Sequence, residues 1–325
     1  MNENNNHLNF SEPQDDNHEL KPRLSPTMSP LSAAFFGLVA VFILYQIVGS
    51  IITLAIFGLD IANADINAIR LLTMGGQILF ILFPSLLFAK LIYQDVSTII
   101  RYKYPSLREI GIFVIGLIIL TPLLQEFLYL QNYVIEKLAV ASPFIKQIKD
   151  FLTEIDKLVE QTYGNLLAAD SVFESSFVIL VVAVVPAVCE EIFFRGYVQK
   201  SFELKLKPFW AIFITALFFG LYHFSPFGLI PLITLGLFLG FAAYMSNSIF
   251  IPMILHFLNN FIAVIAYFVF GSEEIMNTTV IDMEHAGEHT LNFILLTIVF
   301  LALIYFIKNY YHLFTKAKGV QNDMS

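Results

Sequence analysis

Long apolar runs recur along the chain and are separated by short polar segments. Spanning a bilayer takes about 20 mostly apolar residues, and eight runs come close to that length or exceed it. They are residues 31–59, 71–93, 110–130, 176–204, 208–224, 227–245, 249–270 and 291–307. The pattern predicts an all-α fold, a polytopic membrane protein built as a bundle of about eight transmembrane helices. Only two residues, Ser225 and Pro226, separate the fifth run from the sixth, so a re-entrant pair is the alternative there.

Polar segments divide the chain into further parts. Residues 1–30 are Asn-rich and interrupted by prolines, and they predict a disordered N-terminal tail. Residues 31–130 carry three transmembrane helices, and residues 131–175 form an extracytoplasmic connection with apolar residues at helical spacing. That connection is interpreted either as a lid or interfacial helix or as a helix that caps the bundle. After the core at 176–270, residues 271–325 hold an acidic loop, the last transmembrane helix and a cytoplasmic tail.

Composition agrees with a membrane protein and excludes other classes. Hydrophobic residues make up 57% of the 325 and charged residues 14%, and the mean hydropathy is +0.73. Ordinary soluble domains have roughly 25% charged residues. The 18 lysines and arginines are dispersed, so no nucleic-acid partner is expected. One cysteine, Cys189, excludes an intrachain disulfide and a Cys-rich metal site.

The distribution of positive charge predicts the orientation. With the N-terminal segment in the cytoplasm, most lysines and arginines lie on the inner side, and the outer loop at 271–290 has none. We therefore expect both termini in the cytoplasm. No organelle signal is present, which favours a bacterial inner (plasma) membrane.

Charged side chains interrupt the fourth apolar run in the stretch CEEIFFRGY, residues 189–197. A charge at mid-bilayer costs roughly 2.5 to 3.5 kcal/mol, so these residues need partners or a task. Glu191 and Arg195 are four residues apart on one helical face and can pair. Glu190 projects about 100° away and is left free. The alternative is one structural network of all three residues. Glu126, in the third run, is interpreted either as an interhelical hydrogen-bonding residue or as functional.

Three more polar side chains lie in neighbouring runs. His223 in the fifth run is as far from the connecting turn as Glu190, so the two reach equal depth in an antiparallel pair. His256 and Asn260 are four residues apart in the seventh run and share a face. A lone histidine on an apolar helix is usually a satisfied core residue. Two histidines, a free glutamate and an amide on three nearby helices favour a functional site.

These residues form three motifs in order: Glu190-Glu191-x-x-x-Arg195, Phe219-x-x-x-His223 and His256-x-x-x-Asn260. Together they resemble the signature of the CPBP intramembrane proteases, which include type II CAAX prenyl endopeptidases and bacterial abortive-infection and bacteriocin-processing proteins. The resemblance covers about residues 177–261. It implies a helical bundle that hydrolyses peptide bonds in a water-filled cavity, with 176–270 as the catalytic transmembrane core.

The resemblance also implies residue roles. Glu190 and His223 activate the attacking water, His256 and Asn260 hold the oxyanion, and Glu191 and Arg195 support the helix that carries the base. No cofactor is expected. Zinc held by Glu190, His223 and His256 is the alternative, because two histidines and a carboxylate are a catalytic zinc set.

The expected partners are the lipid bilayer and a membrane-associated protein or peptide substrate, with or without a lipid anchor. Two other functions stay open at this point. One is a proton-coupled transporter, because Glu, His and Arg within helices also build proton relays. The other is a non-catalytic membrane scaffold or immunity protein.

Overall fold

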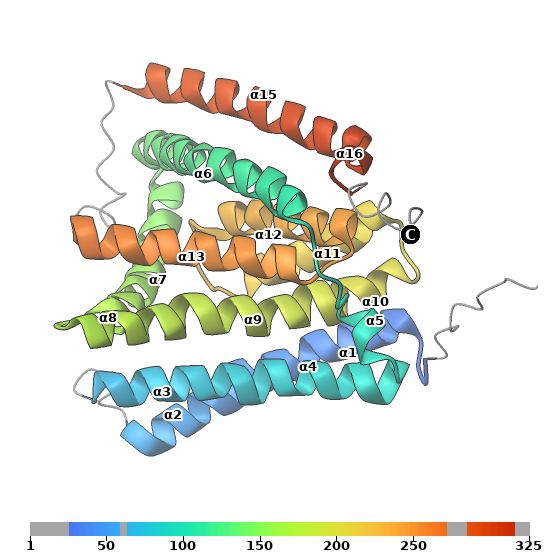
Figure 1. Ribbon diagram of the computed structural model, residues 1–325. Coiled ribbons are helices and arrows are strands. Elements are labelled where there is room, and N and C mark those ends of the chain that lie inside the picture. Colours follow the sequence, from blue (N-terminus) through green and yellow to red (C-terminus); the bar gives the residue numbers. More distant parts are fainter. Residues whose placement is uncertain (1–25, 59–63, 272–284, 316–325) are drawn as a thin grey trace, which may run out of the picture.

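The computed structural model describes residues 26–58, 64–271 and 285–315 (Figure 1). Within these ranges every regular element is a helix, which confirms the predicted all-α class. The predicted disordered tail falls mostly outside the described residues, as does most of the acidic loop at 271–290. Long helices lie side by side along one direction, and α7 crosses them at one end of the bundle (Figure 1).

Several long helices contain π-helical stretches, named η. The first three apolar runs form the elements α1 (Pro30–Phe42), η1 (Ile43–Val48), α2 (Gly49–Phe57), α3 (Ile66–Gln77), η3 (Ile78–Leu82), α4 (Phe83–Phe88), η4 (Ala89–Tyr93), α5 (Val96–Ile99) and α6 (Leu107–Ala141). The rest of the described chain forms α7 (Pro143–Leu167), α8 (Val172–Ile179), η5 (Leu180–Val184), α9 (Val185–Glu191), η6 (Ile192–Val198), α10 (Gln199–Glu203), α11 (Pro208–Leu221), α12 (Leu229–Ser246), α13 (Phe250–Phe270), α15 (Ala286–Tyr310) and α16 (His312–Thr315).

Seven continuous helices in the described residues are long and apolar enough to cross a membrane. Each coincides with one of the predicted runs. The remaining run, 208–224, forms the shorter helix α11, which ends at Leu221. At about 1.5 Å per residue its 14 residues reach roughly 21 Å, less than the hydrocarbon core of about 30 Å. The predicted span at 208–224 is therefore too long, and His223 lies in the turn that follows the helix.

Helices α11 and α12 form a close antiparallel hairpin. Gly236 permits this approach, because a Cβ atom there would lie 3.1 Å from Cα of Ala216. Both ends of the hairpin meet at Arg101, which is 2% exposed. Arg101 pairs with Glu203, just before α11, and donates to the carbonyl of Ala243 in α12 at 3.1 Å. The hairpin thus returns the chain to the same end of the bundle.

The helix that runs from α8 to α10 separates two apolar cores. One core packs residues of α1, α4 and η6 together, and the other packs residues of α6, α12 and α13. In Figure 1 this helix lies between the N-terminal helices and α13. Its middle is therefore buried from both sides, and this is where the sequence places Glu190, Glu191 and Arg195.

The connection at 131–175 is mostly helical. Helix α6 continues well beyond residue 130, and α7 follows directly after Ser142. The C-terminal end of α7 is fixed by Arg70 of α3, which is 1% exposed and donates to the carbonyls of Leu166 and Ala168.

Glu126 ties two helices together. His289 Nδ1 of α15 lies 2.5 Å from one carboxylate oxygen of Glu126, and Asn292 donates to the other at 3.2 Å. Of the two interpretations open for this residue, the structure shows the interhelical hydrogen bond.

Candidate active site

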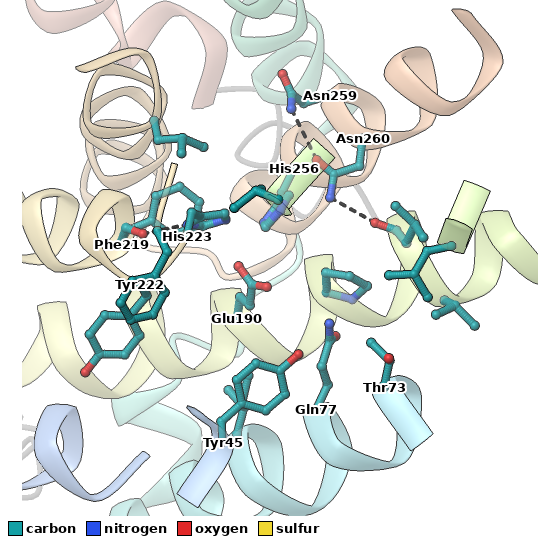
Figure 2. A pocket seen from close by; sticks show the side chains of 18 of the residues that line it. Tyr45, Thr73, Gln77, Glu190, Phe219, Tyr222, His223, His256, Asn259 and Asn260 are labelled. Atoms are coloured by element: carbon teal, nitrogen blue, oxygen red, sulfur yellow. Dashed lines mark hydrogen bonds between the residues drawn. The ribbon is translucent and has the colours of Figure 1, made fainter. Parts of the chain in front are cut away.

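A cavity of about 740 Å³ lies inside the bundle, between the N-terminal helices, the α8–α10 helix, the hairpin turn and α13. Four of the six predicted site residues line it: Glu190, His223, His256 and Asn260. Figure 2 shows their side chains gathered around one space, with the Glu190 carboxylate directed toward the side of the two histidines. The structure thus brings together residues from three helical segments that are far apart in the sequence.

Glu190 is partly buried in α9, between the π-helical stretches η5 and η6. Within the described residues its Oε2 atom is buried and has no hydrogen-bond partner. No hydrogen bond joins Glu190 to His223 in the described part of the chain, although both line the cavity. Glu190 is thus the free carboxylate that helix geometry predicts. Isolated π-helical turns within α-helices are often found at functional sites.

Glu191 does not line the cavity, and one of its carboxylate oxygens is paired with a cation. Arg195 Nη1 donates to Glu191 Oε1 at 2.8 Å, and both side chains are completely buried. The guanidinium also lies 4.3 Å from the ring centroid of Phe219. The predicted pair is present, and it does not include Glu190.

The sequence does not predict the second partner of Glu191. His256 Nδ1 lies 2.7 Å from the same Oε1 atom. An ionised carboxylate only accepts hydrogen bonds, so Nδ1 carries a proton. Nε2 then remains for the cavity. A neutral His256 can only accept at Nε2, whereas a protonated one can donate there.

His223 is oriented by its own helix. Its Nδ1 atom lies 2.7 Å from the carbonyl oxygen of Phe219, one turn earlier. Because a carbonyl only accepts, Nδ1 carries the proton, and the neutral ring has an unprotonated Nε2 atom. His223 therefore has the tautomer that can take a proton from water.

Asn260 binds a backbone carbonyl of the α8–α10 helix that lacks its usual donor within that helix. Pro186 has no N–H and cannot donate to the carbonyl of Val182 four residues earlier. Asn260 Nδ2 donates to that carbonyl at 3.1 Å, and Asn259 donates to Asn260 Oδ1 at 3.2 Å. An amide nitrogen has two hydrogens, so one remains for a ligand in the cavity.

The zinc alternative can be compared with the arrangement of donors. Among the described residues, no three His, Cys, Asp or Glu side chains are grouped closely enough to hold a metal ion. Glu190, His223 and His256 line one cavity but do not form a preassembled ligand set.

Parts of the cavity wall come from regions that the motifs do not cover. Tyr45, Gln46, Thr73 and Gln77 of the N-terminal helices face it, as does Leu158 of α7. Sequence reasoning missed these residues. The signal for Gln46 and Gln77 is the same as for Glu190, namely a polar side chain within an apolar run. Helix α7 contributes Leu158 and Val159 to the wall, a contact that fits both a lid and a helix that caps the bundle.

Residues 173–262 match the family described as type II CAAX prenyl endopeptidase Rce1-like. No curated protein and no solved structure matches the chain. The family match confirms the resemblance predicted from the three motifs, over residues 173–262 of the 325. Together with seven helices long enough to span a bilayer, the match identifies an integral membrane protein.

Proposed function

We propose that the protein is an intramembrane endopeptidase that hydrolyses a peptide bond of a membrane-associated protein or peptide, with or without a lipid anchor. The observation that carries the proposal is the convergence of Glu190, His223, His256 and Asn260 on one buried cavity. Family membership over residues 173–262 supports the reaction class. We further propose a bacterial inner membrane as the location. Cytoplasmic termini are also proposed, and the distribution of lysines and arginines supports them.

Glu190 and His223 activate the attacking water in this proposal. His223 has a free Nε2 acceptor because Nδ1 is bound to the Phe219 carbonyl. Glu190 has a buried oxygen without a partner in the described residues. A water between them donates one hydrogen to each, and one group takes the proton as the oxygen attacks the carbonyl carbon. The same proton is then delivered to the leaving amine, so that proton number balances over the cycle.

His256 and Asn260 stabilise the negative charge that develops on the carbonyl oxygen. Asn260 has one amide hydrogen left after its bond to Val182. His256 donates from Nε2 only as an imidazolium, because Nδ1 is already protonated toward Glu191. The Glu191 carboxylate contacts Nδ1 and supports that charge, and Arg195 pairs with the same carboxylate oxygen. Preorganised donors of this kind are worth about 2.7 to 4 kcal/mol each.

The proposal needs no metal ion, since the two activating groups and the two donors account for each step.

The proposal is tested with the purified protein in nanodiscs and with whole cells. Membrane peptides from wild-type cells are compared by mass spectrometry with those from a Glu190→Gln strain, which identifies the cleaved bond. The peptide that spans that bond is then incubated with Glu190→Gln and His223→Gln. We expect both variants to lose cleavage by at least about 10²-fold while their melting temperatures stay unchanged.

The matched control is Glu126→Gln, the same substitution at a carboxylate that ties α6 to α15 outside the cavity. It should cleave at the wild-type rate. Full cleavage by purified Glu190→Gln would contradict the assignment. Substrate flux through wild-type proteoliposomes without cleavage would favour a transporter instead.

A further inference from the structure

Part of the cavity wall comes from the N-terminal helices, outside the segment that matches the protease family. Four polar side chains lie on this wall: Tyr45, Gln46, Thr73 and Gln77. Figure 2 shows Gln77 extending from α3 toward the helix that carries Glu190. None of the proposed catalytic steps uses this wall.

Gln77 differs from its neighbours in how its polar atoms are satisfied. The Gln46 amide donates to the carbonyl of Tyr222 at 3.1 Å, and the Thr73 hydroxyl donates to the carbonyl of Ile69 at 2.9 Å. Gln77 is only 6% exposed, and its Oε1 atom has no partner in the described part of the chain. A buried polar atom without a hydrogen bond is unfavourable for folding. Such an atom at the wall of a cavity indicates a ligand that supplies the missing partner.

The position of Gln77 points to the reacting segment of the substrate. It is the last residue of α3, where the helix changes to the π-helical stretch η3. Both α3 and η3 pack against α9, the element that carries Glu190. A peptide that enters the space beside Glu190 therefore also meets the Gln77 amide.

A carboxamide matches a peptide group, because each has one acceptor oxygen and N–H donors. An extended peptide in a mostly apolar cavity cannot use water to satisfy its main-chain groups, and unsatisfied groups are costly in such surroundings. We infer that Gln77 binds the main chain of the substrate beside the scissile bond, with Oε1 accepting a hydrogen bond from a substrate N–H. This inference rests on the proposed peptidase function and adds a substrate-binding residue from outside the three motifs.

The test uses main-chain ester substitution. The probe is a fluorescein-labelled peptide that ends in a farnesylated cysteine and three apolar residues, made with each of its last three amide bonds replaced in turn by an ester. An ester lacks the N–H but keeps the shape. Binding is measured by fluorescence anisotropy in nanodiscs in a Glu190→Gln background, so that no probe is cleaved.

We expect one ester to bind the Glu190→Gln protein about tenfold more weakly than the all-amide peptide. In the protein that also carries Gln77→Leu, amide and ester should bind alike. Gln77→Leu should melt no lower than its parent, because it removes an unsatisfied atom. Gln77→Asn keeps the amide but shortens it, and it should also lose the discrimination.

The matched control is Gln199→Leu. Gln199 is another fully buried glutamine with an unpartnered Oε1 in the described residues, but it lies outside the cavity and its amide donates to Gly240 and Glu203. This variant should lose stability and keep the ester discrimination, the opposite of Gln77→Leu.

The inference is overturned if no ester weakens binding, if the probe does not bind, or if Gln77→Leu still discriminates at the same position. Cleavage is scored separately with Glu190 intact. Loss of discrimination in Gln77→Leu without cleavage by the wild type would remove the peptidase function and keep the binding role of Gln77. Cleavage by the wild type together with unchanged discrimination in Gln77→Leu would keep the peptidase function and remove the binding role of Gln77.

Discussion

Replacing Arg195 by methionine should distinguish the contribution of the buried ion pair to protein stability from its contribution to catalysis. The guanidinium and the Glu191 carboxylate are both fully buried, and they are joined at 2.8 Å. Methionine keeps much of the volume but leaves Glu191 with His256 as its remaining charged neighbour. Removing one member of a buried pair typically costs about 3 to 5 kcal/mol, because the other charge is left uncompensated. We expect Arg195→Met to lose free energy of unfolding in this range.

The double variant Glu191→Gln/Arg195→Met removes both charges. Because no uncompensated carboxylate remains, it should regain most of the lost stability. It should not regain cleavage, since the neutral amide no longer supports a protonated His256. Stability is measured by reversible SDS unfolding in mixed micelles, followed by circular dichroism, and cleavage with the same preparations.

Three results would contradict this argument. One is a loss below about 1 kcal/mol in the single variant, the range of an exposed ion pair. Another is a double variant as unstable as the single one. The third is wild-type cleavage by the double variant, which would mean that the Glu191–His256 contact has no part in the reaction.

Other predictions concern the oxyanion site, the metal and α7. Asn260→Ala should lower kcat about 10²-fold to 10³-fold with little change in KM, and a change confined to KM would exclude an oxyanion role. The chelator 1,10-phenanthroline should leave the cleavage rate unchanged; inhibition reversed by added zinc would require the metal form. Burial raises the pKa of Asp156 on α7, against the opposing hydrogen bond from Ser225. The pKa of Asp156 in the folded protein is therefore above the usual value of about 3.9. The protonated carboxyl stabilises the folded protein at low pH, and this stability is lost as the pH rises through the folded-state pKa. Asp156→Asn should be more stable than the wild type at pH 7, and its melting temperature should show no such loss between pH 4 and pH 7. The same pH dependence of melting temperature in both proteins would refute this.

The lengths of the apolar runs were sufficient to predict the bundle, because a bilayer requires a minimum length of each transmembrane helix. Seven predicted runs correspond to seven long helices in the described residues. The run at 208–224 was predicted too long because apolar residues continue through the turn, where Phe224 adopts a φ of 51°. A hydropathy pattern cannot predict a turn whose residues are themselves apolar.

Spacing also explains what the motifs did and did not predict. The pairing of Glu191 with Arg195 follows from a separation of four residues on one helix. The contact of Glu191 with His256 joins two distant helices, and nothing local in the sequence encodes it. Arg70 and Arg101 lie between predicted apolar runs, yet both are buried and bound to carbonyl groups. A count of lysines and arginines cannot distinguish the residues that set membrane orientation from those that bind carbonyl groups at the ends of helices.

The hairpin of α11 and α12 has a mechanical consequence. Its two ends are clamped together by Arg101, while His223 lies at the opposite tip, in the turn. The turn is fastened as well, because Gln46 donates to the carbonyl of Tyr222 at 3.1 Å and the Tyr222 hydroxyl donates to the carbonyl of Leu38 at 2.6 Å. The position of the His223 ring therefore depends on the N-terminal helices, which lie outside the segment that matches the protease family.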